Sequence, residues 1–172
     1  MNVELDDLLK RMAAAKAALA EVDSEGIYTP SVPGPPASRD ALDALRRRLP
    51  DLPESYVALL ARVDGWTAFH DMTDLFSTEE LDPLHPRFRE AEQSLREAAT
   101  YAGDERLARA IPIGASPLDR DILAYVPYDG HFIWGAPGVV EDYDDFEAFM
   151  LGMIAGNWEA VDMAREESDV QA

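Results

Sequence analysis

Closely spaced carboxylates recur along this chain, and such pairs bind Mg²⁺ or Ca²⁺ or exchange protons in acid–base catalysis. The pairs in the C-terminal part are Asp119 with Asp121, Glu141 with Asp142, and Asp144 with Asp145. The chain holds 34 acidic residues among 172, so pairs arise from composition alone, and none fits the spacing of a calcium-binding loop. We therefore interpret them as solvated or helix-capping groups and expect no bound metal. An enzyme that uses them with a divalent cation is the alternative.

Other catalytic residue types are sparse. His70, His85 and His131 stand far apart, without the short spacing of a metal site, and the chain has no cysteine. The segment from Gly114 to Pro117 lacks the second glycine of a nucleophile elbow, and no glycine-rich phosphate-binding loop occurs. The sequence therefore predicts a protein that is not an enzyme and carries no cofactor.

The charge is the most distinctive property of the sequence. Fifteen basic residues against 34 acidic ones give a net charge of −19. From Ala110 onward there are two basic and 13 acidic residues, so this segment alone carries −11. Such a surface repels nucleic acid and anionic membranes and attracts a basic protein. Simple solubility is the alternative explanation.

The sequence favours a cytoplasmic location. The absence of cysteine suits a reducing compartment, and the acidic N-terminus does not resemble a signal peptide. No apolar run approaches the roughly 18 residues that a membrane span requires. We therefore expect no membrane association.

The N-terminal part is predicted to be an extension that precedes the main domain. Apolar residues from Leu5 to Val22 recur at three- and four-residue spacings, which predicts an amphipathic helix within a helical extension at residues 1–26. Residues 27–38 form a linker, in which Tyr28 to Ser38 contains four prolines and must be extended. The apolar stripe of the helix needs a cover. The helix either packs back on its own domain or pairs with the same helix of a second copy to give a homodimer.

The remaining residues predict one α+β domain at 39–155, a small, mostly antiparallel sheet packed against helices, followed by a helical tail at 156–172. Helices are predicted at 39–48, 54–63 and 87–102, with one helical turn opened by Ser77. A closing helix is predicted to begin at Asp144 or Asp145 and to be interrupted by Gly156. Strands are predicted at 66–72, 111–113, 122–126, 132–134 and 139–140.

Five motifs occur in an order that resembles the SUKH superfamily, the Smi/Knr-type domain named for yeast cell-wall regulators and common among bacterial immunity proteins. The motifs are LPDLPESYVALLARVDGW, DLFSTEEL, IPIG, ILAYVPYDGHFIW and YDDFEAFMLGMI. The resemblance covers about residues 38–154 and excludes the N-terminal helix and the linker. The loops at 115–121 and 135–138 depart from the family pattern, at places where members of the family vary to fit their partners.

The resemblance implies a bacterial immunity protein that neutralises a cognate toxin of a contact-dependent or secreted polymorphic system. Such toxins often act on nucleic acids and have basic clefts, which an acidic surface would block. The alternative is a regulatory or scaffold protein of the same family with a partner that is not a toxin. Trp66 and Trp134 are either core residues or apolar anchors of the contact. The expected contact surface comprises Trp66, Asp119, Asp121, Asp129, Trp134, Glu141, Asp142, Asp144 and Asp145.

Overall fold

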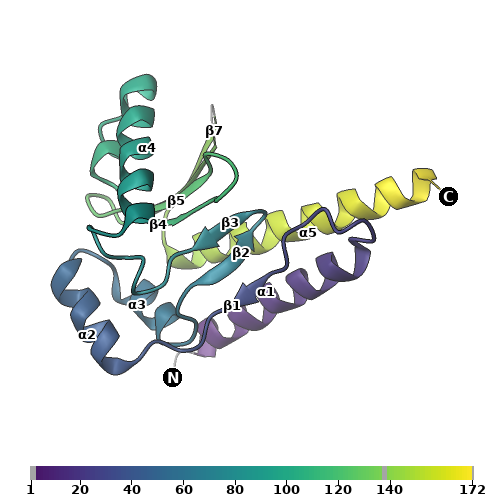
Figure 1. The fold of residues 1–172 in the computed structure, drawn as a ribbon, viewed down its shortest axis with the longest axis horizontal. Helices are drawn as coiled ribbons and strands as arrows, with labels where there is room; N and C mark the ends of the chain where they lie inside the picture. The colour runs from purple at the N-terminus through teal and green to yellow at the C-terminus, as the bar shows by residue number, and fades with distance from the viewer. Residues whose placement is uncertain (1–2, 137–138, 172) are drawn as a thin grey trace.

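The computed structural model describes residues 3–136 and 139–171 and shows an α+β fold (Figure 1). Seven strands form one sheet in sequence order, and every neighbouring pair is antiparallel. The strands are β1 (Val32–Pro33), β2 (Trp66–His70), β3 (Thr73–Leu75), β4 (Ile111–Ala115), β5 (Ile122–Val126), β6 (His131–Ala136) and β7 (Val139–Tyr143). The helices are α1 (Val3–Val22), α2 (Arg39–Arg48), α3 (Glu54–Leu60), α4 (Pro86–Ala102), η1 (Leu107–Arg109) and α5 (Phe146–Gln171). No helix within the described ranges is long and apolar enough to cross a membrane.

Local signals account for the boundaries of several elements. The Ser38 hydroxyl accepts a hydrogen bond from the backbone N–H of Ala41 and caps α2, as its sequence predicts. Helix α4 begins at Pro86 and ends before Gly103, whose φ of 67° is left-handed. Ser77 and Glu80 form the hydrogen bonds of a capping box, but the segment is a turn and not the predicted helical turn.

The predicted strand at 66–72 is instead a hairpin. Asp71 adopts a φ of 48°, and the chain reverses there, so that β3 returns along β2. The proline-rich segment is extended, and its Val32 pairs with Thr67 at the edge of the sheet. Asp71 thereby comes to lie at a sheet end.

Helices cover both faces of the sheet. On one face, α4 and η1 contribute Leu95 and Leu107, which pack with Ala124 of β5 and Ile133 of β6. The other face holds the main core, where Phe132 is in ring contact with Tyr56, Tyr125, Phe146 and Phe149. Strand β5 is buried along its whole length, because both faces are covered.

Helices α1 and α5 run side by side and in the same direction (Figure 1). Leu5, Leu8, Met12 and Leu19 of α1 are buried, Met12 near Asn157 and Leu19 near Val161. The apolar stripe of α1 is therefore covered within one chain, and this stripe is not open to a second copy.

The predicted interruption at Gly156 is wrong, because α5 is one helix from Phe146 to Gln171. The expected boundary between residues 155 and 156 thus falls inside a helix. A Cβ at Gly156 would lie 2.5 Å from Cε1 of His70. A single glycine inside a helix costs only about 1 kcal/mol relative to alanine. Here it allows α5 to approach β2 closely.

Candidate functional site

The predicted acidic contact residues do not form one face. Asp119 and Asp121 lie in the loop between β4 and β5, whereas Asp129 lies in the turn between β5 and β6. These two connections are at opposite ends of β5, whose five residues span roughly 17 Å at about 3.3 Å per residue. The candidates therefore divide into two separate groups of carboxylates.

The first group is partly compensated by a cation of the same chain. Arg106 donates hydrogen bonds to Asp104 at 2.9 Å, to Asp129 at 3.1 Å and to Asp142 at 3.1 Å. His131 Nδ1 lies 2.7 Å from Asp142 Oδ1, and this hydrogen bond raises the pKa of His131. We call these five residues the Arg106 cluster. Its ion pairs tie the segment before η1 to the β5–β6 turn and to β7, which is a structural role.

The remaining candidates of β7 and the start of α5 also have local roles. Glu141 pairs with Trp134 in the β6–β7 register and Asp142 with Ile133, so the two acids point to opposite faces of the sheet. Glu141 accepts a hydrogen bond from the hydroxyl of Tyr143. Asp145 accepts one from the backbone N–H of Ala148 and caps the first turn of α5. The Asp144 side chain is 93% exposed.

The second group surrounds an ordered loop. The backbone N–H of Ser116 donates a hydrogen bond to the backbone carbonyl oxygen of Asp121 across the base of the loop at 2.9 Å. The Ser116 hydroxyl accepts from the N–H groups of Leu118 and Asp119, and the Asp119 carboxylate accepts from the N–H of Asp121. These bonds hold the tip, where Leu118 is 70% exposed. We call residues 116–121 the 116–121 loop.

The carboxylates at this loop repel one another. Burial raises the pKa of Asp121 to about 6, and the negative charges of Asp119 and Asp71 add to the effect. Within the described ranges, none of these three residues takes part in an ion pair. We call Asp71, Asp119 and Asp121 the carboxylate cluster. Unlike the carboxylates of the Arg106 cluster, these three have no ion pair among the described residues, although Arg120 is exposed in the same loop and Lys16 lies close enough to Asp71 to interact with its charge.

Replacing Asp121 with asparagine is expected to stabilise the protein at pH 7 by roughly 1 kcal/mol, a value discounted for the solvent exposure of this group. Because the folded-state pKa is raised, ionised Asp121 disfavours the fold above about pH 6. The gain should shrink as the pH falls through 6 toward 4, where the wild-type carboxyl is protonated in the fold. Urea unfolding of both proteins at pH 7.5 and pH 4.5 measures this difference. An equal difference at the two pH values would contradict the assignment.

The structure does not place the two tryptophans as exposed anchors. Trp66 is only 4% exposed, its indole N–H donates to the Ser31 hydroxyl at 2.8 Å, and its ring packs edge-on against Phe69. The expectation that Trp66 is an accessible anchor is therefore wrong, because the proline-rich segment lies over the start of β2. Trp134 is partly buried, with its ring 5.4 Å from that of His70.

Two residues of the site were missed in the sequence. Leu118 is an apolar residue between Pro117 and Asp119 in a polar turn, which was an available signal of an exposed contact. Asp71 gave no such signal, because its approach to Asp121 depends on the pairing of β3 with β4. Leu118 replaces the tryptophans as the apolar element beside the acidic groups.

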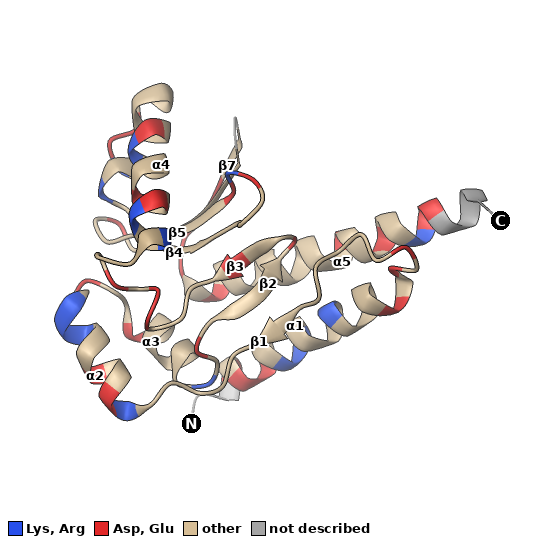
Figure 2. Cartoon of the chain, in the orientation of Figure 1, with Lys and Arg blue, Asp and Glu red and all other residues tan. Residues whose placement is uncertain are grey.

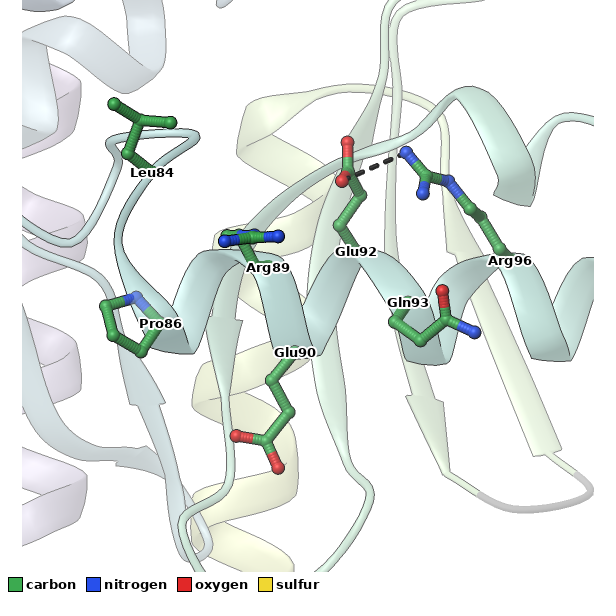
Figure 3. A pocket seen from close by; sticks show the side chains of 7 residues that line it. All are labelled: Leu84, Pro86, Arg89, Glu90, Glu92, Gln93 and Arg96. Carbon is green, nitrogen blue, oxygen red and sulfur yellow. Dashed lines mark ion pairs between the residues drawn. The ribbon is translucent and has the colours of Figure 1, made fainter.

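One hollow of the surface lies beside α4, away from both groups of carboxylates. This open hollow of about 480 Å³ lies on the outer side of α4, where Arg96 pairs with Glu92 at 3.0 Å (Figure 3). Its lining consists of Leu84, Pro86, Arg89, Glu90, Glu92, Gln93 and Arg96. This lining contains neither a histidine nor a nucleophile. Among the described residues, no group of histidine and carboxylate side chains is arranged to hold a metal ion.

Comparison with known proteins identifies no family for this chain. No protein-family model matches it, and no curated protein matches it significantly. The function is therefore inferred from the charge distribution and from the geometry of the 116–121 loop.

Proposed function

We propose that this chain is an immunity protein that binds a basic cognate toxin through the carboxylate cluster and Leu118, and thereby blocks the toxin's nucleic-acid-binding cleft. One observation carries the proposal: the cluster combines three carboxylates that have no ion pair among the described residues with an exposed leucine on an ordered loop. The SUKH-like order of sequence motifs supports the same function.

The cluster suits a cationic partner for two physical reasons. Burial is the main reason that the pKa of Asp121 is raised, and a Lys or Arg of a partner placed near Asp119 and Asp121 would relieve the repulsion that adds to it. The hydrogen bonds of the 116–121 loop also fix its shape before binding, which reduces the conformational entropy lost on association. The loop is therefore ready to accept a basic surface.

The long-range field favours the same encounter. Lys and Arg residues gather on α1, α2 and α4, while acidic residues are spread over most of the chain (Figure 2). The carboxylate cluster lies outside these helices, in loops at one end of the sheet. The net charge of −19 thus steers a basic protein toward the chain, and at the cluster three carboxylates stand beside the single cation Arg120 of the 116–121 loop.

Charge reversal tests the contact surface. Asp119→Lys and Asp121→Lys are each expected to weaken partner binding about tenfold, or about 1.4 kcal/mol, because each replaces attraction by repulsion. Asp144→Lys is the matched control, since it changes the net charge equally at the other end of the sheet and its side chain is 93% exposed. Calorimetric titration with the partner gives the affinities. Equal weakening by all three variants would show steering without a contact at the cluster.

The identity of the partner separates the toxin proposal from its alternative. The tagged chain is used to capture its partner from the native cell, and that partner is then expressed alone and together with the chain. We expect growth arrest with the partner alone and recovery on co-expression. A captured partner that is harmless when expressed would instead support a regulatory or scaffold protein.

A further inference from the structure

We propose that two copies of this chain form a symmetric dimer through the outer side of the α1–α5 helix pair, with Trp158 of each copy seated in a hollow of the other. This surface is separate from the carboxylate cluster, and the inference does not rest on the toxin-binding proposal. It also differs from the covered stripe of α1, because α5 provides most of the contact.

The hollow lies on the seam between the two helices. Its volume is about 320 Å³. It is lined by Arg11, Ala14, Leu151, Ile154, Ala155 and Trp158. The small side chains of Ala14 and Ala155 create the hollow, and its lining by Leu151 and Ile154 makes it apolar. Trp158 stands beside this space with 38% of its surface exposed.

Helix α5 carries two rows of side chains, and the chain buries one row fully and the other only in part. Met153, Asn157 and Val161 recur at four-residue spacing and are buried against α1 and the sheet. Leu151, Ala155 and Trp158 follow each other at spacings of four and three residues, which places them together on another side of the helix. Such a pattern is typical of a helix that packs against a further helix. Leu151 is partly buried against the main core, whereas Ala155 and Trp158 remain exposed in the described part of the chain.

The shape of this surface favours a second copy as its occupant. A two-fold interface uses the same patch on both subunits, so the patch must carry both a projection and a space that receives it. Trp158 is the projection, and the adjoining hollow is the space. When the helix pairs of two copies cross in antiparallel orientation, each Trp158 meets the hollow of the other copy. The two tryptophans then fill both hollows at once.

The charges on this surface agree with that orientation. Arg11 lies at the hollow and is in no ion pair within the described part of the chain. Asp162 follows Trp158 by one turn of α5, and its side chain is 70% exposed while it pairs with Arg165 at 3.6 Å. An antiparallel two-fold arrangement brings Arg11 of each copy toward Asp162 of the other. The local attraction counteracts part of the repulsion between two chains of charge −19.

Cross-linking tests the interface directly, because the chain contains no native cysteine. Ala155→Cys treated with a short bismaleimide is expected to give a covalent dimer, and adding Trp158→Ala should abolish it. Leu118→Cys is the control, because Leu118 is 70% exposed and lies in the 116–121 loop, away from the helix pair. Equal cross-linking at both positions would overturn the proposal.

Sedimentation equilibrium supplies a second measurement on the unmodified chain. Wild-type protein is expected to show twice the mass of one chain, and Trp158→Ala is expected to weaken the dimer at least tenfold. Circular dichroism and thermal unfolding verify that the variant keeps its fold, as expected for a side chain that is 38% exposed. If Trp158→Ala unfolds, Asp162→Arg replaces it and should weaken the dimer as well. A wild-type monomer at the highest soluble concentration would overturn the proposal.

Discussion

Replacing Phe132 with alanine is expected to lower the free energy of unfolding by about 3–5 kcal/mol. Phe132 is 1% exposed, and its ring centroid lies within 5.0–6.5 Å of those of Tyr56, Tyr125, Phe146 and Phe149. These residues come from α3, β5 and the start of α5, so the truncation leaves a cavity where three elements meet. The loss is a large part of the 5–15 kcal/mol typical of a folded domain.

Urea denaturation measures this loss as a lower midpoint with an unchanged slope. Tyr128→Ala is the matched control, because Tyr128 is an aromatic residue in the adjoining β5–β6 turn and is 85% exposed. We expect its effect to stay within about 0.5 kcal/mol. A loss below 1 kcal/mol for Phe132→Ala would show that the ring cluster does not hold the sheet against α5.

Elements with local signals were predicted well from the sequence. Ser38 fixes the start of α2, and Gly103 fixes the end of α4, because a cap acts on backbone groups only a few residues away. Strand β5 was predicted with its observed bounds, since the apolar run ends at Pro127 and the Asp129–Gly130 turn follows. The α+β class follows from the order of these elements.

Features that depend on distant contacts were predicted less well. From the sequence, Gly156 was predicted to interrupt the closing helix. It lies inside α5 instead, where His70 from β2 packs against it. From the sequence, Trp66 was a candidate anchor of the partner contact, but the segment around Ser31 covers it. In both cases the deciding neighbour is more than 30 residues away in the chain.

The candidate site shows the same limit. Nothing near Asp129 or Asp142 in the sequence indicates that Arg106 forms an ion pair with both. The opposite directions of Glu141 and Asp142, however, follow from the alternation of side chains along a strand and were predictable once β7 was recognised as one. The carboxylate cluster required the sheet register, because Asp71 comes from a hairpin about 50 residues before Asp121.

Lys16→Met is expected to raise the free energy of unfolding by about 3 kcal/mol at pH 7, from the difference between a pKa of 10.5 and one of about 8 at 1.36 kcal/mol per pKa unit. Lys16 is 7% exposed on the side of α1 that meets α5 and β2, and it takes part in no ion pair among the described residues. Burial lowers its pKa to about 8, and the negative charge of Asp71 only partly opposes this shift. Methionine has a similar length and needs no solvation, so it removes the penalty of burying an ammonium group without opening a cavity.

The pH dependence distinguishes this electrostatic effect from better packing. Below pH 8 the buried lysine is charged in both states, and the wild type carries the full penalty. Between pH 8 and its ordinary pKa of 10.5, the folded state releases the proton first, so wild-type stability rises and the advantage of Lys16→Met declines. Lys10→Met is the matched control, since Lys10 is the other lysine of the chain, is exposed, and should change stability by less than about 0.5 kcal/mol. Chemical denaturation of the three proteins at pH 7 and pH 10 measures the effect, and a gain for Lys16→Met that is equal at both pH values would assign it to packing alone.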